Sequence, residues 1–434
     1  MQKILALLAI CCFSFLSCKK ENTAQLEPDN EIKETKKDSI NPNFRVNRLD
    51  SVTAINKTTS WFTTNKSFDR IFEVQNSLYW GFEFKPNGDL VPYNRSTTNT
   101  WSASKSYYWN DLGAYIYTDL TGDGLKDLWA YYWKNPWPTN APGLHLFSEY
   151  EKDPKVYDLQ VGLVQVRKNV VTDLNNDNTP ELVLFSSGYD GPPFPGDAIG
   201  IFHVKEKRYQ NLREDIGYFH GGATGDINND GFIDIVAYSG GSMVIPIHPT
   251  AYLNQGGQQF ILSNQIFKNF NTSDDNYYTV ELFDMTKDGK LDLLLGGQNK
   301  LLLIPQVNGE FNRNDAINLP IEAGLELMDI AFFDFNKDGQ TDVLTMSNKS
   351  GYNGYGLRLF LNDKLQFKEA TNAYFDITTG SGTNAWIKWI HLFDYDNDGD
   401  IDVVADGLFG DLRGMNGRKI WWKNNGGKFF LINE

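Results

Sequence analysis

Residues 394–405 read DYDNDGDIDVVA, a nine-residue acidic loop that runs directly into an apolar segment. Carboxylates stand at loop positions 1, 3, 5 and 9, Gly399 stands at position 6, and the carbonyl of Asp400 at position 7 is a further oxygen donor. This donor set suits a hard cation, because calcium takes six to eight oxygen ligands around a sharply turned backbone. Glycine at position 6 permits the left-handed turn. The apolar run after position 9 predicts a buried β-strand.

Five more copies of this loop precede it along the chain. They are DLTGDGLKD from Asp119, DLNNDNTPE from Asp173, DINNDGFID from Asp226, DMTKDGKLD from Asp284 and DFNKDGQTD from Asp334. Successive copies start 54, 53, 58, 50 and 60 residues apart, and each leads into an apolar run. One such copy can be a solvated turn without a metal, but six in register predict a repeat fold.

Position 12 separates two kinds of calcium site. An EF-hand needs a bidentate Glu there and a helix on each side of the loop. Position 12 holds no acidic residue in any copy; its occupants are Ala130, Leu184, Ala237, Leu295, Thr345 and Ala405. The pattern therefore excludes an EF-hand or a dockerin. Magnesium fits less well than calcium, since it demands octahedral geometry and keeps several waters.

The six loops resemble the FG-GAP or VCBS repeat, which is known from the propeller of integrin α-subunits, where blades carry a calcium loop between their first and second strands. The resemblance covers about residues 112–434. It implies an all-β fold, a β-propeller of four-stranded blades, with up to six calcium ions. The expected ligand residues at positions 1, 3, 5 and 9 are Asp119, Thr121, Asp123, Asp127, Asp173, Asn175, Asp177, Glu181, Asp226, Asn228, Asp230, Asp234, Asp284, Thr286, Asp288, Asp292, Asp334, Asn336, Asp338, Asp342, Asp394, Asp396, Asp398 and Asp402.

The second loop departs most from the pattern. Asn178 replaces the glycine, Pro180 stands at position 8 and Glu181 replaces the last Asp, so we rank this site weakest. The loops concentrate the negative charge of the chain. Positions 1, 3, 5 and 9 hold three carboxylates in each of the first five loops and four in the sixth. The loop carboxylates together outnumber the 15 negative charges of the net balance. Like charges held this close repel strongly. We therefore expect calcium to contribute to folding.

Short polar turns divide the segments behind the loops into strand pairs, such as NKLLLIPQVNGEFN from Asn299. Each loop unit then has four strands, the size of a propeller blade. A hairpin without a loop, residues 78–93, indicates a degenerate first blade at about 55–111, before calcium blades at about 112–434. Seven blades are expected over 51–434, and six blades plus an extra hairpin is the alternative.

The N-terminus predicts export. Residues 1–17 combine Lys3, an apolar run and Ser17 before Cys18, as in a signal peptide. The stretch from Phe15 to Cys18 resembles the lipobox of bacterial lipoproteins, which implies lipidation of Cys18 and a place in the bacterial cell envelope. An ordinary secretory signal or an uncleaved anchor is the alternative. Residues 18–50 are charged and poor in large apolar side chains, which predicts a flexible tether.

The remaining composition narrows the partners. The charge of -15 disfavours nucleic acid, and all three cysteines lie in the first 18 residues, so the body of the chain has no disulfide. The resemblance to FG-GAP propellers implies that the long aromatic loops lie at the ends of the blades opposite the calcium loops, and binding residues often lie on such loops. Their candidate stacking residues for a sugar or peptide are Trp133, Trp137, Tyr189, Phe194, Tyr352, Tyr355 and Trp386. The alternative is that these rings fill space between blades.

No catalytic motif is present in the sequence. The five histidines, His145, His203, His220, His248 and His391, lack the spacing of a catalytic or metal cluster. We therefore expect a module that binds a glycan or a protein partner. A lyase-type enzyme acting on a polysaccharide, or a scaffold subunit without a small ligand, are the alternatives, because a fold does not fix a function.

Overall fold

A computed structural model describes most of the chain after residue 162 and scattered strands before it. The described stretches are 163–189, 191–271, 276–321, 324–381, 387–394, 396, 398–408 and 420–433, with strands between residues 70 and 158 and residues 120–122. The predicted signal peptide, Cys18 and the tether lie outside the described residues. No helix in the described stretches is long and apolar enough to cross a membrane.

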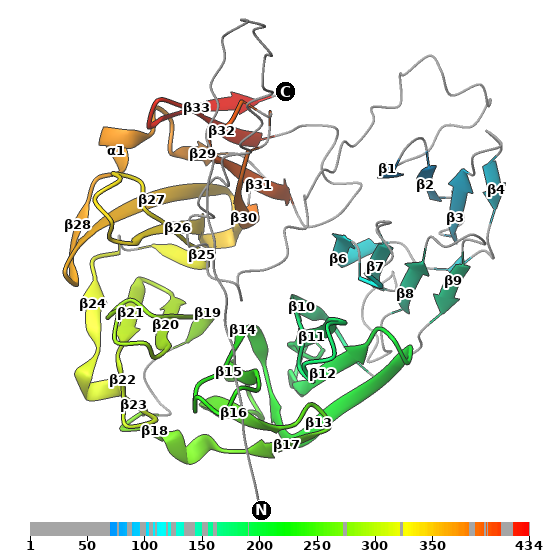
Figure 1. The fold of residues 1–434 in the computed structure, drawn as a ribbon, viewed down its shortest axis with the longest axis horizontal. Helices are drawn as coiled ribbons and strands as arrows, with labels where there is room; N and C mark the ends of the chain where they lie inside the picture. Colours follow the sequence, from blue (N-terminus) through cyan, green and yellow to red (C-terminus); the bar gives the residue numbers. More distant parts are fainter. Residues whose placement is uncertain are drawn as a thin grey trace, which may run out of the picture. The chain divides into compact units, whose positions relative to one another are not determined.

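Most of the described strands form seven sheets in which antiparallel neighbours follow one another in chain order (Figure 1). In the first two sheets the strands are β1 (Arg70–Gln75), β2 (Leu78–Phe84), β3 (Asp89–Arg95) and β4 (Trp101–Ala103), with β5 (Tyr107–Tyr108) paired to β3, and then β6 (Asp111–Thr118), β7 (Asp127–Trp133), β8 (Leu144–Glu149) and β9 (Lys155–Asp158). The predicted hairpin of residues 78–93 is thus β2 and β3 of the first sheet.

The next two sheets contain β10 (Val166–Thr172), β11 (Glu181–Ser186), β12 (Asp197–His203) and β13 (Arg208–Gly217), and then β14 (Phe219–Gly225), β15 (Asp234–Gly240), β16 (Ile247–Gln255) and β17 (Gln259–Leu262). The fifth contains β19 (Tyr277–Phe283), β20 (Asp292–Gly297), β21 (Lys300–Ile304) and β24 (Ile317–Leu319). The last two contain β25 (Leu325–Phe333), β26 (Asp342–Lys349), β27 (Gly354–Asp363) and β28 (Gln366–Glu369), with β29 (Thr379–Ser381) paired to β27, and β30 (Ile387–Phe393), β31 (Asp402–Leu408), β32 (Ile420–Asn425) and β33 (Lys428–Asn433).

Burial falls from the second strand of a sheet to the fourth. Every residue of β11, β15 and β20 is buried, which explains why the apolar runs after the loops do not alternate with polar residues. The fourth strands β13, β17 and β28 are half-buried or exposed at most positions. The second strands therefore lie between neighbouring sheets and the fourth strands at the outer edges.

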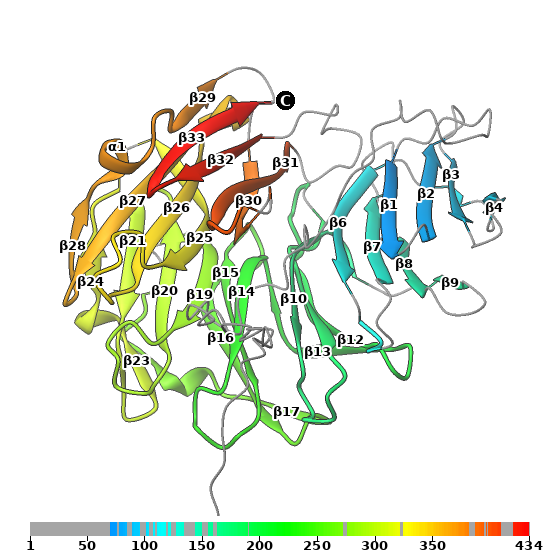
Figure 2. The same ribbon diagram turned by 45° about the horizontal axis from the view of Figure 1, so that its top comes forward.

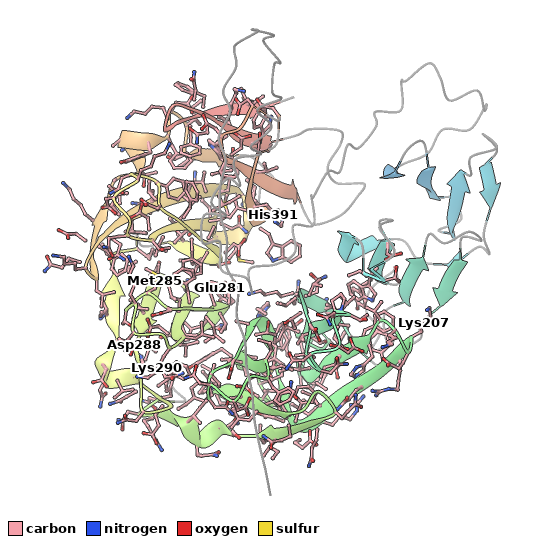
Figure 3. All side chains as sticks on the ribbon, viewed as in Figure 1. Lys207, Glu281, Met285, Asp288, Lys290 and His391 are labelled. Atoms are coloured by element: carbon pink, nitrogen blue, oxygen red, sulfur yellow. The ribbon has the colours of Figure 1, made fainter. Side chains whose placement is uncertain are left out.

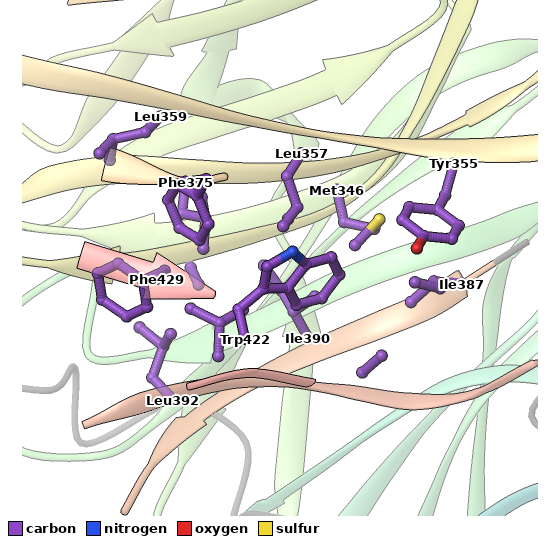
Figure 4. Close-up of a cluster of buried hydrophobic side chains, with 14 of the residues drawn as sticks. Met346, Tyr355, Leu357, Leu359, Phe375, Ile387, Ile390, Leu392, Trp422 and Phe429 are labelled. Carbon is purple, nitrogen blue, oxygen red and sulfur yellow. The ribbon is translucent and has the colours of Figure 1, made fainter. Parts of the chain in front are cut away.

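Successive sheets pack face to face through their first strands. The first strands β6, β10, β14, β19, β25 and β30 each contact the next one in this order, and Figure 2 shows β10, β14 and β19 side by side. Apolar cores fill the spaces between sheets. One example places Trp422 of the last sheet against Met346 and Leu357 of the sheet before it (Figure 4). The fold is a β-propeller, as the sequence predicted; the number of blades stays a prediction.

Two features of the sheets were not predicted. Five of the first strands carry a β-bulge in the half away from the loop, as at Phe219/Gly221 and Leu327/Asp329. In the fifth sheet, the expected third and fourth strands are separated. Pro305 follows β21 and has no N–H to continue a ladder, and the hairpin β22 (Gln306–Val307) with β23 (Glu310–Asn312) joins the short strand β18 (Phe267–Lys268) in a small sheet of its own. β24 then supplies the fourth strand.

Short helical turns complete the described part: η1 (Asn264–Ile266), η2 (Arg313–Asp315), η3 (Ser350–Tyr352) and α1 (Thr371–Tyr374). They all lie in connections or after an outer strand, and none separates the cation loops from the strands that flank them.

Candidate functional site

The acidic loops lie between the first and second strands of their sheets, as expected. The third loop, residues 226–234, follows β14 and ends in β15. Both carboxylate oxygens of Asp226 at position 1 accept backbone hydrogen bonds, from Asp230 N at 3.0 Å and Gly231 N at 2.9 Å. The carboxylate at position 5 in turn accepts from Phe232 N at 2.9 Å. These bonds fold the loop so that its side-chain oxygens converge.

The same bonds recur in the other described loops. The position 6 N–H lies 2.8 to 2.9 Å from the position 1 carboxylate in the second to sixth loops. Gly231 has a φ of 90° and Gly399 one of 94°, which is the left-handed region that glycine enters without strain. Of the first loop, only Leu120, Thr121, Gly122 and the buried Asp127 have described side chains, so Asp119 and Asp123 lie outside the described residues.

The position 9 carboxylates are buried, unlike those at position 5. Asp234 has an exposure of 0%, and its two oxygens accept from Ile227 N at 3.0 Å and Asn254 N at 2.8 Å. Burial raises the pKa of Asp234 to about 7, and burial also raises the pKa of Asp342, its equivalent in the fifth loop, to about 6. Position 9 therefore joins the loop to the third strand of the sheet, and a nearby cation would favour its charged form.

The loop residues fit a hard cation. In the sixth loop the carboxylates of Asp394, Asp396 and Asp398 place one oxygen each within 4.8 Å of one another. The donors are oxygens only, which is the chemistry that calcium prefers. Among the described residues, this is the one group of three or more Asp, Glu, His or Cys side chains whose ligand atoms lie close enough together to share a metal ion. The histidines His203, His220, His248 and His391 lie in strands and form no such group.

In two loops a lysine side chain pairs with the loop carboxylates. In the sixth loop the lysine lies on the third strand of the sheet, and in the second loop it follows the third strand. Lys423 of β32 pairs with Asp396 and with Asp398, the latter at 2.7 Å. In the second loop, Lys205 Nζ lies 3.0 Å from Asp177 Oδ2. Hydrogen bonding to Lys205 lowers the pKa of Asp177, and hydrogen bonding to Lys423 lowers the pKa of Asp398. A cation that enters either loop competes with an ammonium group.

The fourth loop has a lysine of its own. Lys290 at position 7 donates to Asp288 Oδ2 at 3.1 Å, and both side chains lie at the end of the sheet (Figure 3). Met285 at position 2 is buried, with its N–H 2.9 Å from Asp292 Oδ2. The loop thus combines a buried anchor at position 9 with an exposed carboxylate at position 5.

The second loop keeps its shape despite its altered sequence. Asn178 has a φ of 64°, so it takes the left-handed conformation of the glycine it replaces. Glu181 reaches the same anchor point as the aspartates, with Leu174 N 2.8 Å from its Oε2. Its other oxygen, Oε1, accepts from the Asn175 amide at 3.1 Å and lies 3.5 Å from His203 Nδ1.

A buried amide behind the loops was not predicted from the sequence. Asn254 Nδ2 donates to Ile233 O at 3.0 Å and to Leu174 O in the preceding repeat at 2.7 Å. Gln306 repeats this arrangement, with Nε2 3.0 Å from Ile227 O of the preceding repeat. These amides connect neighbouring loops across the boundary between sheets. An Asn or Gln 14 to 22 residues after position 9, as at Asn362 and Asn424, is the signal that would have identified them.

The aromatic candidates at the opposite end are only partly described. Trp137 and Trp386 lie outside the described residues, as do the side chains of Trp133 and Tyr352. Tyr189 and Phe194 are half-buried in the connection between β11 and β12, and the Phe194 ring meets Tyr218 edge to face at 6.3 Å. Tyr355 is 5% exposed, with its ring 6.0 Å from Trp422, so most of its surface fills the core between two sheets (Figure 4).

A pocket of about 570 Å³ lies along β27. It begins where β26 connects to β27 and follows β27 from there. The strands β28 and β29 both pair with the outer edge of β27, and the pocket extends towards the gap between them. Its walls contain mostly polar side chains together with Tyr355 and Leu357; the polar ones are Lys349, Arg358, Glu369, Thr371, Asn372, Thr378 and Thr379. Its volume falls within the range typical of small-molecule sites.

Distant solved structures resemble the chain only weakly. A lectin from Agrocybe aegerita whose structure concerns recognition of terminal N-acetylglucosamine is 14% identical over 81% of this chain and 88% of its own, with a TM-score of 0.44. The Dos1 propeller is 7% identical over 78% of this chain and 74% of its own, with a TM-score of 0.43. The rhamnogalacturonan lyase YesW is 12% identical over 82% and 74%, with a TM-score of 0.37. Similarities this low assign neither ligand nor activity.

Family comparison is more specific. No curated protein matches the chain. The family model of the FG-GAP-like repeat matches three overlapping stretches, residues 226–295, 284–345 and 334–405. Each match starts at position 1 of one loop and ends at position 12 of the next, so the third to sixth loops lie within them. Residues 226–405 therefore contain FG-GAP-like repeats.

Proposed function

We propose that this chain is an exported, lipid-anchored propeller that holds calcium in up to six loops and binds a glycan at the opposite end of its sheets. The observation that carries the binding function is the pocket along β27. Hydroxyl and amide groups such as those of Thr378, Thr379 and Asn372 surround it, and these groups suit the many hydroxyls of a sugar. Tyr355 and Leu357 add an apolar wall, as in most small-molecule sites.

The loops and the pocket have separate roles in this proposal. The loops lie where the first strand turns into the second, whereas the pocket starts where β26 connects to β27, which is the other end of the same antiparallel sheet. Calcium would stabilise the scaffold by neutralising the clustered carboxylates. A rigid scaffold then presents the connecting segments for binding.

Filling the pocket tests the binding function. The calcium-loaded protein is screened against soluble and immobilised polysaccharides, and the variant Thr379→Trp places a large side chain at the exposed rim of the pocket. We expect wild type to retain at least one glycan and the variant to lose it. Gln366→Trp is the matched control, because Gln366 is exposed on the neighbouring β28 outside the pocket. Equal binding by the two variants, or no glycan bound by wild type, contradicts the proposal.

Anchoring has its own test. Cells that express wild type or Cys18→Ser are labelled with a fatty-acid analogue, and membranes are separated from soluble material. We expect wild type to carry the label in the membrane fraction and the variant to be unlabelled. Labelling of the Cys18→Ser protein would exclude Cys18 as the lipid site.

A further inference from the structure

Lys349 is the last residue of β26 and lines the pocket along β27. The side chain is half-buried. Its stem is packed against the backbone, since the Cδ atom lies 3.1 Å from where a Cβ on Gly354 would stand. The stem of the Lys349 side chain therefore lies beside the pocket.

Lys349 has no counter-ion of its own. Within the described stretches, its ammonium group makes no ion pair or hydrogen bond. Two other lysines of this protein do have one: Lys168 contacts Glu281 at 2.7 Å, and Lys205 contacts Asp177 at 3.0 Å. An anion that enters the pocket therefore meets an ammonium group that is not already engaged in an ion pair within the described residues.

The rest of the pocket suits a ligand that carries hydroxyls as well as a negative charge. Glu369 is the carboxylate in the wall, and its Oε1 already accepts from Thr371 N at 3.1 Å. Its remaining oxygen can accept from a sugar hydroxyl, and Arg358 is a second basic residue in the wall. The segment that carries Thr378 and Thr379 is fixed by the bond from Leu357 N to Thr378 O at 2.8 Å. The hydroxyls are therefore held in place beside the ammonium group.

We infer that this pocket binds an acidic sugar residue, whose carboxylate or sulfate group pairs with the ammonium group of Lys349 while its hydroxyls bond to Glu369, Thr378 and Thr379. The inference rests on the proposed glycan-binding function and names the class of sugar. It distinguishes this pocket from one for neutral sugars, because a neutral ligand would leave the ammonium group unpaired. Lysine suits this role as a compact charge with three donors.

The test compares three matched oligosaccharides by isothermal titration calorimetry with the calcium-loaded protein. They are an oligogalacturonide, the same oligosaccharide with its carboxyl groups reduced to alcohols, and a sulfated oligosaccharide of similar length. We expect an acidic form to bind roughly 10- to 100-fold more tightly than the reduced form, which is the usual worth of a hydrogen bond to a charged group. The carboxylate and sulfate arms show which anion is preferred.

Variants assign the preference to Lys349. Lys349→Met should bring acidic and reduced forms to equal affinity, and Lys349→Arg should restore the preference. Lys368→Met removes one positive charge from the exposed strand β28, outside the pocket. This control variant should keep the wild-type preference for the acidic oligosaccharide. Thermal melts of all variants should agree within about 2 °C, because Met keeps most of the apolar stem and Lys349 makes no ion pair or hydrogen bond within the described residues that would be lost.

The outcomes separate this inference from the proposed function. If wild type binds acidic and reduced forms equally, or Lys349→Met keeps the preference, the inference is wrong, while binding that Thr379→Trp abolishes would still support a glycan pocket. If wild type binds no oligosaccharide in any arm or in the polysaccharide screen, both the inference and the proposed function are wrong.

Discussion

The two ends of each sheet are built in different ways. At the cation-loop end, the same bond from the position 6 N–H to the position 1 carboxylate recurs in five loops at 2.8 to 2.9 Å. At the opposite end, the contacts differ from sheet to sheet: a four-membered polar cluster joins Asp215 of β13 to β16 of the next sheet, and the Lys349 pocket lies beside β27. The repeated end is therefore a scaffold, and the opposite end is where one repeat differs from another.

Removing calcium should have the largest effect, and it acts on the repeated end alone. Without a cation, each loop holds three or four like charges close together. Each filled loop adds about 2.7 kcal/mol when free calcium is 100 times its dissociation constant. We expect chelation to lower the midpoint of thermal unfolding by roughly 10 °C or more. A midpoint that is the same with chelator and with calcium would exclude a structural role for the ion.

Cutting the connection between neighbouring loops should come next. Asn254→Ala removes the donor to Leu174 O, in a buried setting, and to Ile233 O, in a partly buried one. We expect a loss of about 2–4 kcal/mol, because buried carbonyls without a donor are costly. Asn424→Ala is the matched variant, since the Asn424 amide donates to Ile401 O of its own repeat, and it should cost about 1–2 kcal/mol.

Urea unfolding in saturating calcium measures this difference. Equal losses for the two variants would mean that the bond to the preceding repeat contributes nothing, and that each loop is stabilised by its own sheet alone.

The opposite end offers a pH-dependent contact. His248 Nε2 lies 3.0 Å from both oxygens of Asp215, which also accepts from Thr250 and Asn264. Burial alone would lower the pKa of His248, but its bond to Asp215 outweighs burial and raises it. Burial alone would raise the pKa of Asp215, but the bonds from His248 and Thr250 lower it. This pair ties β13 of one sheet to β16 of the next.

The sign of the effect follows from these directions. A raised histidine pKa gives stability that is present below its ordinary value and is lost as pH rises through the raised value. The lowered pKa of Asp215 gives stability that is lost only as pH falls below the ordinary range of aspartate. His248→Gln should therefore cost about 0.5–1 kcal/mol at pH 5.5 and less at pH 8.5. Thr250→Val removes a neutral donor to the same carboxylate, so its cost should be equal at both pH values; the same pH dependence in both variants would contradict the ion pair.

The same contrast explains what could be predicted from the sequence. The loops, the strands behind them and the all-β fold were predictable because six copies in register show which residues the backbone needs, as with Gly399 or the apolar run after Asp402. Lys349 and Asn254 were not identified, because each acts through partners that only folding brings near. Tyr355 was expected as a stacking residue, and the structure places most of its ring in the core against Trp422. Periodicity cannot separate an exposed aromatic ring in a connection from one that fills the space between sheets.

Lysines beside the loops should produce the smallest effect, and they test whether the six loops are equivalent. Lys423 pairs with Asp396 and Asp398 in the loop with the most carboxylates, so the ammonium group competes with an entering cation there. We expect Lys423→Met to raise the calcium affinity of the sixth loop by roughly two- to fivefold, since exposed ion pairs are weak. Isothermal titration calorimetry with calcium measures the affinities of the loops. The variant Asp394→Asn identifies which binding phase belongs to the sixth loop, and Lys368→Met controls for the change in net charge. An unchanged or weaker affinity in Lys423→Met would mean that Lys423 does not compete with calcium. The repeated end would then be uniform in its metal affinity, and differences between repeats would be confined to the opposite end of the sheets.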